Sequence, residues 1–256
     1  MKLRSERIDR LTVHVYDSRI SMGQAAGREA TERIKRIIRD KGTANIIFAA
    51  APSQNDLFAS LLESDIDWSR VRAFQQDEYI GISQDEPAGF GNFLRRTIYD
   101  KVEFKEVHYL LSDEDSVQEK MLEYEELLMK YPPDLIFLGV GENGHLAFND
   151  PPVADFEDPK RIKIVELEKA CRQQQVNDAC FTSLDEVPTH ALTLTLSFIG
   201  SVPEAICVVP NIRKAEAIRQ ALRGPVSTEC PATLLRTLRD AVLYLDADSA
   251  SLAFSD

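Results

Sequence analysis

Two kinds of apolar pattern alternate along the chain. Short runs in which almost every residue is apolar or β-branched predict buried strands. Between these runs, apolar residues recur every three or four positions, which predicts helices with one buried face. The runs predict strands at residues 11–15, 45–50, 71–74, 107–111, 135–140, 161–166, 191–196, 204–209 and 241–245. Helical spacing is found at residues 22–38, 57–62, 93–98, 117–128 and 218–222.

This alternation continues over the whole chain of 256 residues. The length suits one α/β domain with a large core, and no segment has the composition of a linker. The sequence therefore predicts a single domain over residues 1–256, built on a Rossmann-like open, mostly parallel sheet with helices on both faces.

The strand predicted at residues 135–140 leads into a glycine-rich turn. Gly139, Gly141 and Gly144 allow positive φ angles and a close approach of the backbone to a ligand. In open α/β sheets, ligands bind at the carboxyl ends of the central strands. We therefore expect the active site here, among the polar side chains that crowd the turn: Glu142, Asn143, His145, Asn149 and Asp150.

The same Gly-x-Gly-x-x-Gly spacing occurs in dinucleotide-binding proteins. That fingerprint opens a helix and is followed by an acidic residue about 20 positions later. Here residues 149–152, Asn-Asp-Pro-Pro, break the chain soon after the glycines. Nucleotide binding is therefore the weaker alternative. His145 could also be a structural loop residue, although its polar neighbours favour a catalytic one.

Three other predicted strand ends carry candidate chemistry. Asp77 and Glu78 follow the strand at residues 71–74, and neighbouring carboxyl groups in a cleft can divide acid and base roles between them. Ser53 lies in a strand-to-helix turn, where it either holds an anion or caps the helix. Arg213 and Lys214 lie at a helix start, where the helix dipole disfavours cations, so either an anion binds there or both are solvated.

Charge and composition exclude several classes of protein. The formal net charge is −12, which argues against nucleic-acid binding, since that needs basic patches. No apolar run approaches the roughly 18 residues of a membrane span, so we expect no membrane association. The four cysteines are unclustered and the start of the chain lacks an apolar signal region, which indicates a reduced, cytoplasmic protein. The histidines and cysteines show no metal-ligand spacing, and we predict no metal.

Residues 139–151, Gly-Val-Gly-Glu-Asn-Gly-His-Leu-Ala-Phe-Asn-Asp-Pro, resemble the signature of glucosamine-6-phosphate deaminases. This family shares an α/β superfamily with the 6-phosphogluconolactonases. A second motif is also similar, Phe74-x-x-Asp-Glu-Tyr-x-Gly81, and shorter landmarks follow in family order at residues 161–163, 187–188, 191–193 and 214–215. The resemblance spans most of the chain. It implies an enzyme, without organic cofactor, that converts an amino-sugar 6-phosphate and water into a ketose 6-phosphate and ammonia.

The resemblance also implies a role for each candidate residue. His145 opens the pyranose ring, and Asp150 orients and polarises this histidine, with Asn143 in the same turn. Asp77 takes the C2 proton and returns it to C1, and Glu78 supports Asp77. The predicted phosphate-binding residues are Ser53, Gln54, Lys214, Gly141 and Gly144.

One further expectation follows from the resemblance. Arg161 and Lys163 match basic residues of an allosteric sugar-phosphate site in oligomeric members, although both also suit an ordinary surface. Whether the protein forms a homo-oligomer is therefore an open question. Separately from the resemblance, the irregular acidic and then glutamine-rich composition predicts residues 151–182 as a flap over the site, with a surface helix as the alternative for residues 167–182.

The residues that would hold the substrate depart from the family pattern. Asp150 stands where Glu is common, which shortens the reach to His145 by one methylene. Residues 51–55, Ala-Pro-Ser-Gln-Asn, replace a phosphate turn of the form Thr-Gly-[Gly/Ser]-Thr-Pro. The family's phosphate-binding arginine is missing from the nearest match, residues 177–181, and Arg172 is a candidate to compensate. We therefore predict a retained acid–base centre with a shifted or weakened substrate preference.

Two other functions stay open. One is a lactonase-type hydrolase, although that pattern runs toward Ser-Leu-Phe-Pro after Gly-His, where this chain has residues 146–150, Leu-Ala-Phe-Asn-Asp. The other is a non-catalytic sugar-phosphate sensor. The altered phosphate turn favours a sensor, whereas Asp77 and His145 disfavour it, since a sensor needs no proton transfer. No motif distinguishes a gluco from a galacto amino sugar.

Overall fold

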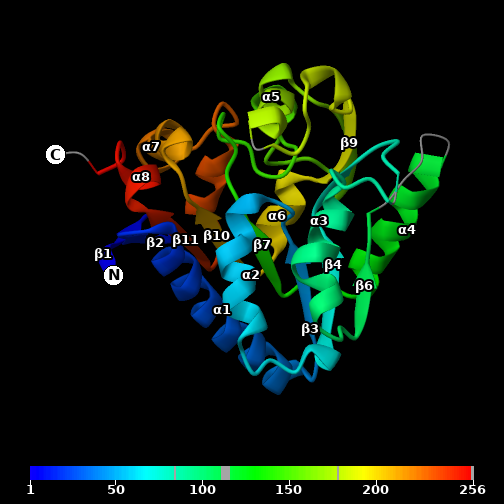
Figure 1. Cartoon of the computed structure of the whole chain (residues 1–256), viewed down its shortest axis with the longest axis horizontal. Coiled ribbons are helices and arrows are strands. Elements are labelled where there is room, and N and C mark those ends of the chain that lie inside the picture. The colour runs from blue at the N-terminus through cyan, green and yellow to red at the C-terminus, as the bar shows by residue number, and fades with distance from the viewer. Residues whose placement is uncertain (84, 111–115, 178, 255–256) are drawn as a thin grey trace.

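The computed structural model describes residues 1–83, 85–110, 116–177 and 179–254. Within these residues an eight-stranded sheet has the order β1-β2-β11-β10-β7-β3-β4-β6, and only the β1–β2 pair is antiparallel (Figure 1). Its strands are β1 (Lys2–Ile8), β2 (Leu11–Tyr16), β3 (Ala44–Phe48), β4 (Val71–Gln75), β6 (Glu106–His108), β7 (Leu135–Leu138), β10 (Glu204–Val209) and β11 (Ala241–Asp246).

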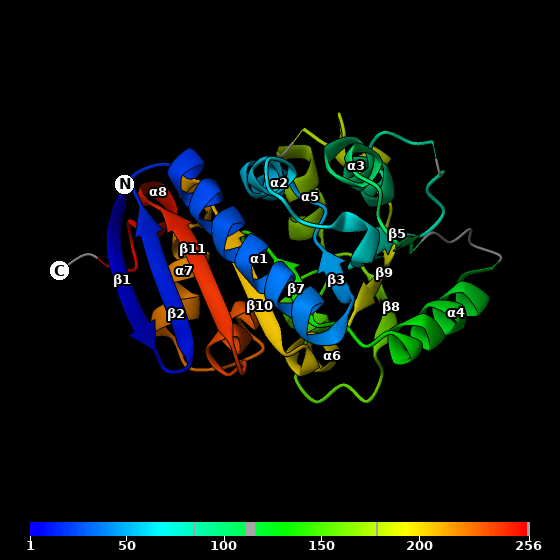
Figure 2. The same ribbon diagram turned by 90° about the horizontal axis from the view of Figure 1, so that it is seen from below.

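Helices cover both faces of this sheet, as the sequence predicts. Figure 2 shows α1, α2 and α3 on one face and α4, α6 and α7 on the other. The described helices are α1 (Arg19–Lys41), α2 (Asn55–Leu62), α3 (Phe90–Thr97), α4 (Val117–Lys130), α5 (Lys169–Asn177), α6 (Leu196–Ser201), α7 (Ala215–Arg223) and α8 (Ala247–Ala250). None of the described helices is long and apolar enough to cross a membrane.

The central strands bury both of their faces, which explains their continuous apolar runs. In β7, Leu135 and Phe137 pack into the core under α1 and α2. Ile136 and Leu138 alternate with them and pack into the core on the opposite face. The prediction of a strand buried on both sides is therefore confirmed for the strand that leads into the glycine-rich turn.

Two glycines let α1 and α2 approach closely. A Cβ atom at Gly23 would lie 2.3 Å from the Cβ of Asp56, and one at Gly27 would lie 2.4 Å from the Cβ of Ser60. Such contacts are too short for any larger residue. The close packing fixes the start of α2, and with it the turn after β3, against the first turn of α1.

Three segments form a separate small sheet. The strands β5 (Asp77–Tyr79), β9 (His190–Leu194) and β8 (Ile162–Glu166) pair antiparallel in this order. This sheet and α5 lie at the carboxyl ends of the central strands of the main sheet (Figure 1). The strands predicted at residues 161–166 and 191–196 are confirmed, but they do not join the main sheet.

The structure differs from the predicted elements mainly at the edges. The strand β1 was not predicted because most of its side chains are exposed and polar, as is common at a sheet edge. The strand predicted at residues 107–111 is shorter, and Leu111 lies outside the described residues. Residues 169–177 form a helix, which is one of the two alternatives stated for this segment, whereas Asp178 is not described.

The order of the strands places a crevice between β3 and β7. The chain leaves β3 for β4 on one side, and it leaves β7 for β10 on the other side. Connections that diverge in this way open a crevice at the carboxyl ends of the two strands, which is where α/β proteins bind their ligands.

Candidate active site

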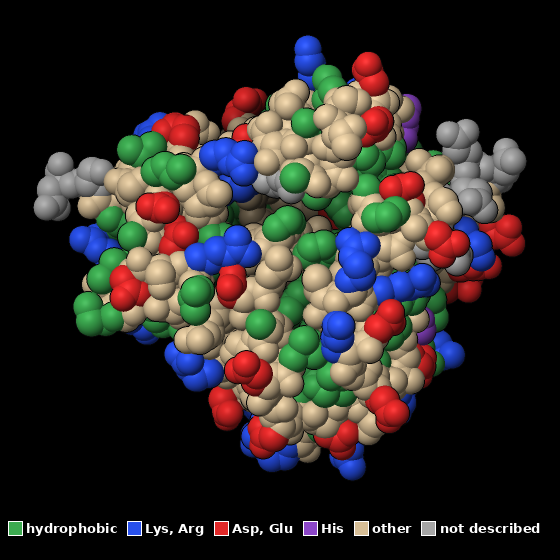
Figure 3. Space-filling view, viewed as in Figure 1, with side chains coloured by type: hydrophobic (Ala, Val, Ile, Leu, Met, Phe, Trp, Pro, Cys, Tyr) green, Lys and Arg blue, Asp and Glu red, His purple; other side chains and the backbone are tan. Residues whose placement is uncertain are grey.

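A cavity lies at this crevice, below the small sheet and α5. Figure 3 shows the face hollowed near its centre, with Lys and Arg side chains on both sides. The cavity is open to solvent and measures about 880 Å³ when the solvent at its mouth is included. Most of its lining comes from the segments that follow β3, β4, β7 and β10, with Arg19 and α5 residues added.

His145, Asp150 and Asn143 form one hydrogen-bonded group in the turn after β7. The Nδ1 atom of His145 lies 2.9 Å from Oδ1 of Asp150, and Nδ2 of Asn143 donates to the same oxygen at 2.8 Å. Burial acts to raise the pKa of the Asp150 carboxyl, but the hydrogen bonds from His145 and Asn143 bring this pKa below its ordinary value. Asp150 is therefore an ionised carboxylate that accepts the Nδ1–H proton and leaves Nε2 of His145 available.

The glycines of this turn make room for the histidine. A Cβ atom on Gly141 would lie 2.3 Å from Cε1 of His145, so the imidazole ring packs directly against the backbone. Gly144 has φ +84°, and a Cβ atom there would lie 2.7 Å from Sγ of Cys230. Of these two predicted phosphate-binding glycines, Gly141 lines the cavity and Gly144 does not. Both are explained by the shape of the turn.

The turn does not continue into a helix. An isolated bridge joins Leu146 and Asn149, and a short 3-10 turn follows at Pro151–Val153. A dinucleotide fingerprint needs a helix whose N-terminus faces the phosphates. The weaker nucleotide alternative therefore lacks the structure that it requires.

Asp77 is the first residue of β5, two positions after the end of β4, and it lines the cavity. Its side chain is buried, with 5% of the residue exposed. Burial, and then the negative charge of Glu78, raise the pKa of the Asp77 carboxyl well above its ordinary value of 3.8. A carboxyl group with a raised pKa can both take up and release a proton near neutral pH.

Glu78 points away from the cavity. Its carboxylate accepts hydrogen bonds from the backbone N–H groups of Tyr79 and Phe90 at 3.0 Å and of Gly91 at 2.7 Å. Phe90 and Gly91 begin α3, so Glu78 satisfies free N–H groups at the helix start. Burial raises the pKa of Glu78, although these donors oppose the shift. The negative charge of Glu78 therefore acts on the pKa of Asp77, but Glu78 does not line the cavity.

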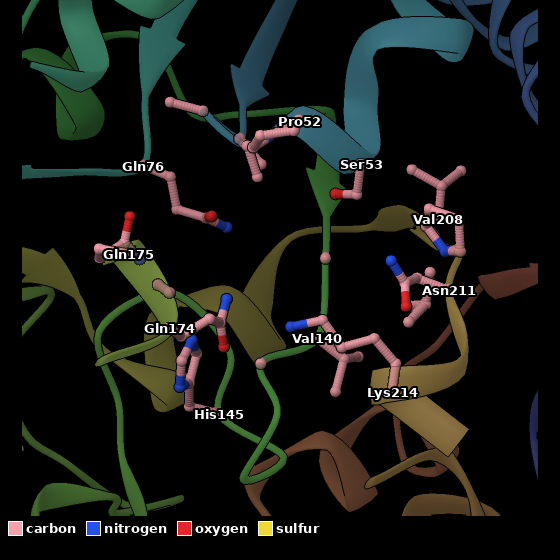
Figure 4. A pocket seen from close by; sticks show the side chains of 18 of the residues that line it. Pro52, Ser53, Gln76, Val140, His145, Gln174, Gln175, Val208, Asn211 and Lys214 are labelled. Atoms are coloured by element: carbon pink, nitrogen blue, oxygen red, sulfur yellow. The ribbon is translucent and has the colours of Figure 1, made fainter. Parts of the chain in front are cut away.

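The predicted phosphate-binding residues divide into two groups. The hydroxyl of Ser53 and the side chain of Lys214 both point into the cavity (Figure 4). Gln54 is fully buried, and its Nε2 donates to the carbonyl of Leu138 at 3.1 Å and to Oγ of Ser53 at 3.2 Å. Gln54 is therefore placed to hold the end of β7 and the Ser53 hydroxyl, and it does not line the cavity.

Two arginines line the cavity, whereas Arg172 does not. Arg19, in the first turn of α1, donates to the carbonyl of Pro52 at 2.5 Å and pairs with Asp56. Arg213 lies 3.6 Å from Glu142. Arg172 instead donates to the carbonyls of residues 184 and 187. The prediction that Arg172 compensates for a missing phosphate arginine is therefore wrong, because backbone carbonyls already occupy its guanidinium.

Arg161 and Lys163 also lie outside the cavity lining. Lys163 is buried, pairs with Asp158 at 3.1 Å and donates to the carbonyl of Val153 at 2.6 Å. Arg161 pairs with Glu125 at 3.1 Å. These contacts tie β8 to its neighbours, so each side chain has a structural partner, and allostery stays a prediction.

One cluster among the described residues has the composition of a metal site. Candidate ligand atoms of His145, Asp150 and Cys171 lie within 4.8 Å of one another. Burial, followed by the charge of Asp150, raises the pKa of the Cys171 thiol well above its ordinary value. A metal would have to displace both the thiol proton and the hydrogen bond between His145 and Asp150. We therefore interpret the cluster as part of the hydrogen-bonded group that His145 and Asp150 form, and not as a metal site.

The sequence analysis did not identify several glutamines that line the cavity, because no sequence motif marks them. Gln76 follows β4, and Gln174 and Gln175 belong to α5. Arg19 is likewise unmarked in the sequence, since it reaches the turn after β3 only through the packing of α1 on α2. Arg213 could be found from its position at a helix start.

Known proteins resemble this chain over most of its length. A family model for glucosamine-6-phosphate isomerases and 6-phosphogluconolactonases matches residues 17–244. A glucosamine-6-phosphate deaminase from Exiguobacterium sibiricum is 32% identical over 218 residues, which cover 85% of this chain and 84% of that protein. Another, from an Exiguobacterium species, is 33% identical over 226 residues, which cover 88% and 87%.

Solved structures agree with this relationship. A monomeric glucosamine-6-phosphate deaminase superposes with a TM-score of 0.85 at 25% identity, covering 94% of this chain and 99% of that chain. A 6-phosphogluconolactonase from Trypanosoma brucei superposes with a TM-score of 0.77 at 15% identity, covering 97% and 99%, which shows the shared fold. The predicted fold class and family are confirmed, and the chain belongs to the family of glucosamine-6-phosphate isomerases and 6-phosphogluconolactonases.

Proposed function

We propose that this protein is an amino-sugar-6-phosphate deaminase. It would convert glucosamine 6-phosphate, or its galactosamine counterpart, and water into a ketose 6-phosphate and ammonia. The observation that carries the proposal is the placement of two proton-transfer groups in one cavity. Asp77 and the Asp150-bound His145 both line it, and cations line it as well.

His145 is assigned the opening of the sugar ring. Because Asp150 accepts the Nδ1–H proton, Nε2 is the nitrogen that exchanges protons with the substrate. It takes the proton of the anomeric hydroxyl and delivers a proton to the ring oxygen, so that the C1–O5 bond breaks and an open-chain aldehyde forms. Asp150 keeps the ring oriented and stabilises its charged form, as a third group does in a catalytic triad.

Asp77 is assigned the carbon-to-carbon proton transfer. It takes the proton from C2 of the open-chain amino aldehyde, and the carbonyl oxygen at C1 gains a proton, which gives an enolamine. Asp77 then returns its proton to C1, which leaves an iminium group at C2. Water adds to C2 and ammonia leaves, so the ketose 6-phosphate remains. A raised pKa suits both halves, because Asp77 must bind this proton between the two steps.

Ser53, Lys214, Arg19 and Arg213 are assigned to the phosphate. Their hydroxyl and cationic groups come from three segments that line the same cavity. With a net charge of −12, the protein as a whole repels anions, so local cations must offset that field. Figure 3 shows Lys and Arg side chains flanking the hollow.

Arg19→Gln tests the phosphate assignment. The variant is expected to raise KM for the sugar phosphate about tenfold with little change in kcat, because it removes uniform binding. Inhibition by inorganic phosphate should weaken by a similar factor. Lys35→Gln is the matched control, since Lys35 pairs with Asp65 on the surface, and it should leave both values unchanged. A fall in kcat at constant KM would assign Arg19 to the chemical step instead.

The proposed reaction is tested by ammonia release from purified protein. Glucosamine 6-phosphate and galactosamine 6-phosphate are offered separately, with 6-phosphogluconolactone hydrolysis followed in parallel. Turnover of one amino sugar is the expected result, and it also identifies the preferred epimer. Hydrolysis of the lactone without ammonia release would instead support the hydrolase alternative. Binding of the sugar phosphates without any turnover would point to a sensor.

A further inference from the structure

The amide of Gln76 is a buried group that lacks a partner for its donor. Gln76 is only 3% exposed, and its side-chain amide points into the cavity (Figure 4). Its Nε2 atom has no hydrogen-bond partner among the residues that the structure describes. A buried donor without a partner is unfavourable, and such groups in native proteins usually have a functional explanation. The partner of Gln76 must therefore come from whatever occupies the cavity.

The preceding residue shows the opposite arrangement. Oε1 of Gln75 accepts from the backbone N–H of Leu110 at 3.1 Å. Its Nε2 donates to Glu78 and to the carbonyl of Asp77, each at 2.8 Å. The side-chain amide of Gln75 is therefore fully satisfied by groups of the protein itself. Gln76, one position further along the strand end, faces the cavity beside Asp77.

Three of the four side-chain amides that line the cavity lie on the side of Gln76, and the fourth lies across from it. Figure 4 shows Gln174 and Gln175 near His145 and Gln76, with Lys214 and Asn211 across the cavity from Gln76. Neutral amides suit the hydroxyl groups of a sugar, whereas cations suit its phosphate. We therefore expect the sugar chain and the phosphate to contact different sides of the cavity.

We propose that Gln76 is a specificity-determining residue, whose Nε2–H donates to a sugar hydroxyl at C3 or C4. The proposal rests on the proposed function for the identity of the sugar. The carbon at which Asp77 acts is C2, and Gln76 adjoins Asp77 in the chain, so the hydroxyls that follow C2 are the acceptors beside it. A site that hydrogen-bonds a substrate hydroxyl rejects analogues that lack it, because its own buried group is then left unpaired.

Gln76→Met tests this proposal, because methionine has a similar length and no donor. The variant is expected to lower kcat/KM for the preferred amino-sugar 6-phosphate about tenfold. The 3-deoxy and 4-deoxy analogues are assayed beside it. For one of the two, wild type and variant should have equal kcat/KM, which identifies the hydroxyl that Gln76 binds. An equal proportional loss for all three sugars, or no loss, would overturn the proposal.

Stability without ligand supplies an independent readout. Gln76→Met removes an unpaired buried amide, so its thermal midpoint should equal or exceed that of the wild type. Gln75→Met is the matched control and should lower the midpoint, since it breaks three hydrogen bonds. If Gln76→Met lowers the midpoint as the control does, Gln76 is structural and the proposal fails.

Failure of the proposed function would look different. In that case wild-type protein would release no ammonia from either amino sugar. The ligand-free midpoints of the two variants would still test the amide. Midpoint shifts produced by glucosamine 6-phosphate and its deoxy analogues would then replace the rates, with the same expected equality for one analogue.

Discussion

Asp77→Asn is expected to lower kcat by about 10³- to 10⁴-fold, in the upper part of the range for a general base. An amide of the same size cannot take the C2 proton, while binding of the phosphate end should persist, so KM should change little. The measurement is ammonia release, together with solvent deuterium incorporated at C1 of the product. A variant that keeps wild-type turnover would contradict the role of Asp77. Protein that binds the sugar phosphate without turnover in either form would be a sensor.

The same substitution has an expected effect on stability with a defined sign. The folded state raises the pKa of Asp77 above 3.8, its ordinary value, so the folded protein holds this proton more tightly than the unfolded chain. The free energy of unfolding therefore falls as the pH rises from about 4 through the raised pKa of Asp77. Asp77→Asn removes that loss and should be more stable than wild type at pH 7. The difference should vanish below about pH 3.8, where Asp77 is protonated in both states.

Gly141→Ala is expected to lower kcat by about 10²-fold or more, although it adds a single methyl group. The new Cβ atom would lie 2.3 Å from Cε1 of His145 and 2.4 Å from both ring nitrogens. The ring must therefore leave the position in which its Nδ1 atom contacts Asp150 at 2.9 Å. Displacement of a catalytic group by about 1 Å can cost 10²-fold in rate.

Backbone strain does not explain this expected loss. Gly141 is absent from the glycines with positive φ, which are Gly42, Gly81 and Gly144. In the Gly141→Ala variant, kcat should therefore fall strongly, whereas the thermal midpoint should change much less. Gly200→Ala is the control, because its nearest side-chain contact would be 3.8 Å away, and it should keep full activity. An active Gly141→Ala protein would show that His145 does not need its present position.

The sequence predicts that His145, Asp150 and Asn143 lie together, because they are close along the chain. His145, Asp150 and Asn143 lie within eight residues, so one turn can bring them together. The main sheet is predicted for a similar reason, since strands buried on both faces must be apolar throughout. The edge strand β1 has no such constraint, and its polar residues conceal it.

Directions of side chains are harder to predict than positions. Asp77 and Glu78 are neighbours in a strand, where successive side chains point to opposite sides. Only one of them could face the cavity, and this rule alone could have separated their roles. Gln54 and Ser53 show the same division at their turn.

Contacts between distant segments leave no local pattern at all. Arg19 reaches the cavity because Gly23 and Gly27 bring α1 against α2. Arg172 is sequestered by carbonyls at residues 184 and 187. Neither outcome depends on the spacing of residues around the arginine, so only the tertiary structure could decide between these two candidates.

The position of β11 has a consequence for how the chain is made. This strand fills the place between β2 and β10, so residues 12–16 pair with residues 242–246. During synthesis, β2 cannot pair with its parallel neighbour β11 until almost the whole chain has been made. Pairing over such a separation folds slowly, and unpaired edges attract other chains. Asp246, at the end of β11, also accepts the backbone N–H of Asn211 in the cavity wall. A nascent chain that stops short of β11 is therefore expected to aggregate without ever assembling a working site.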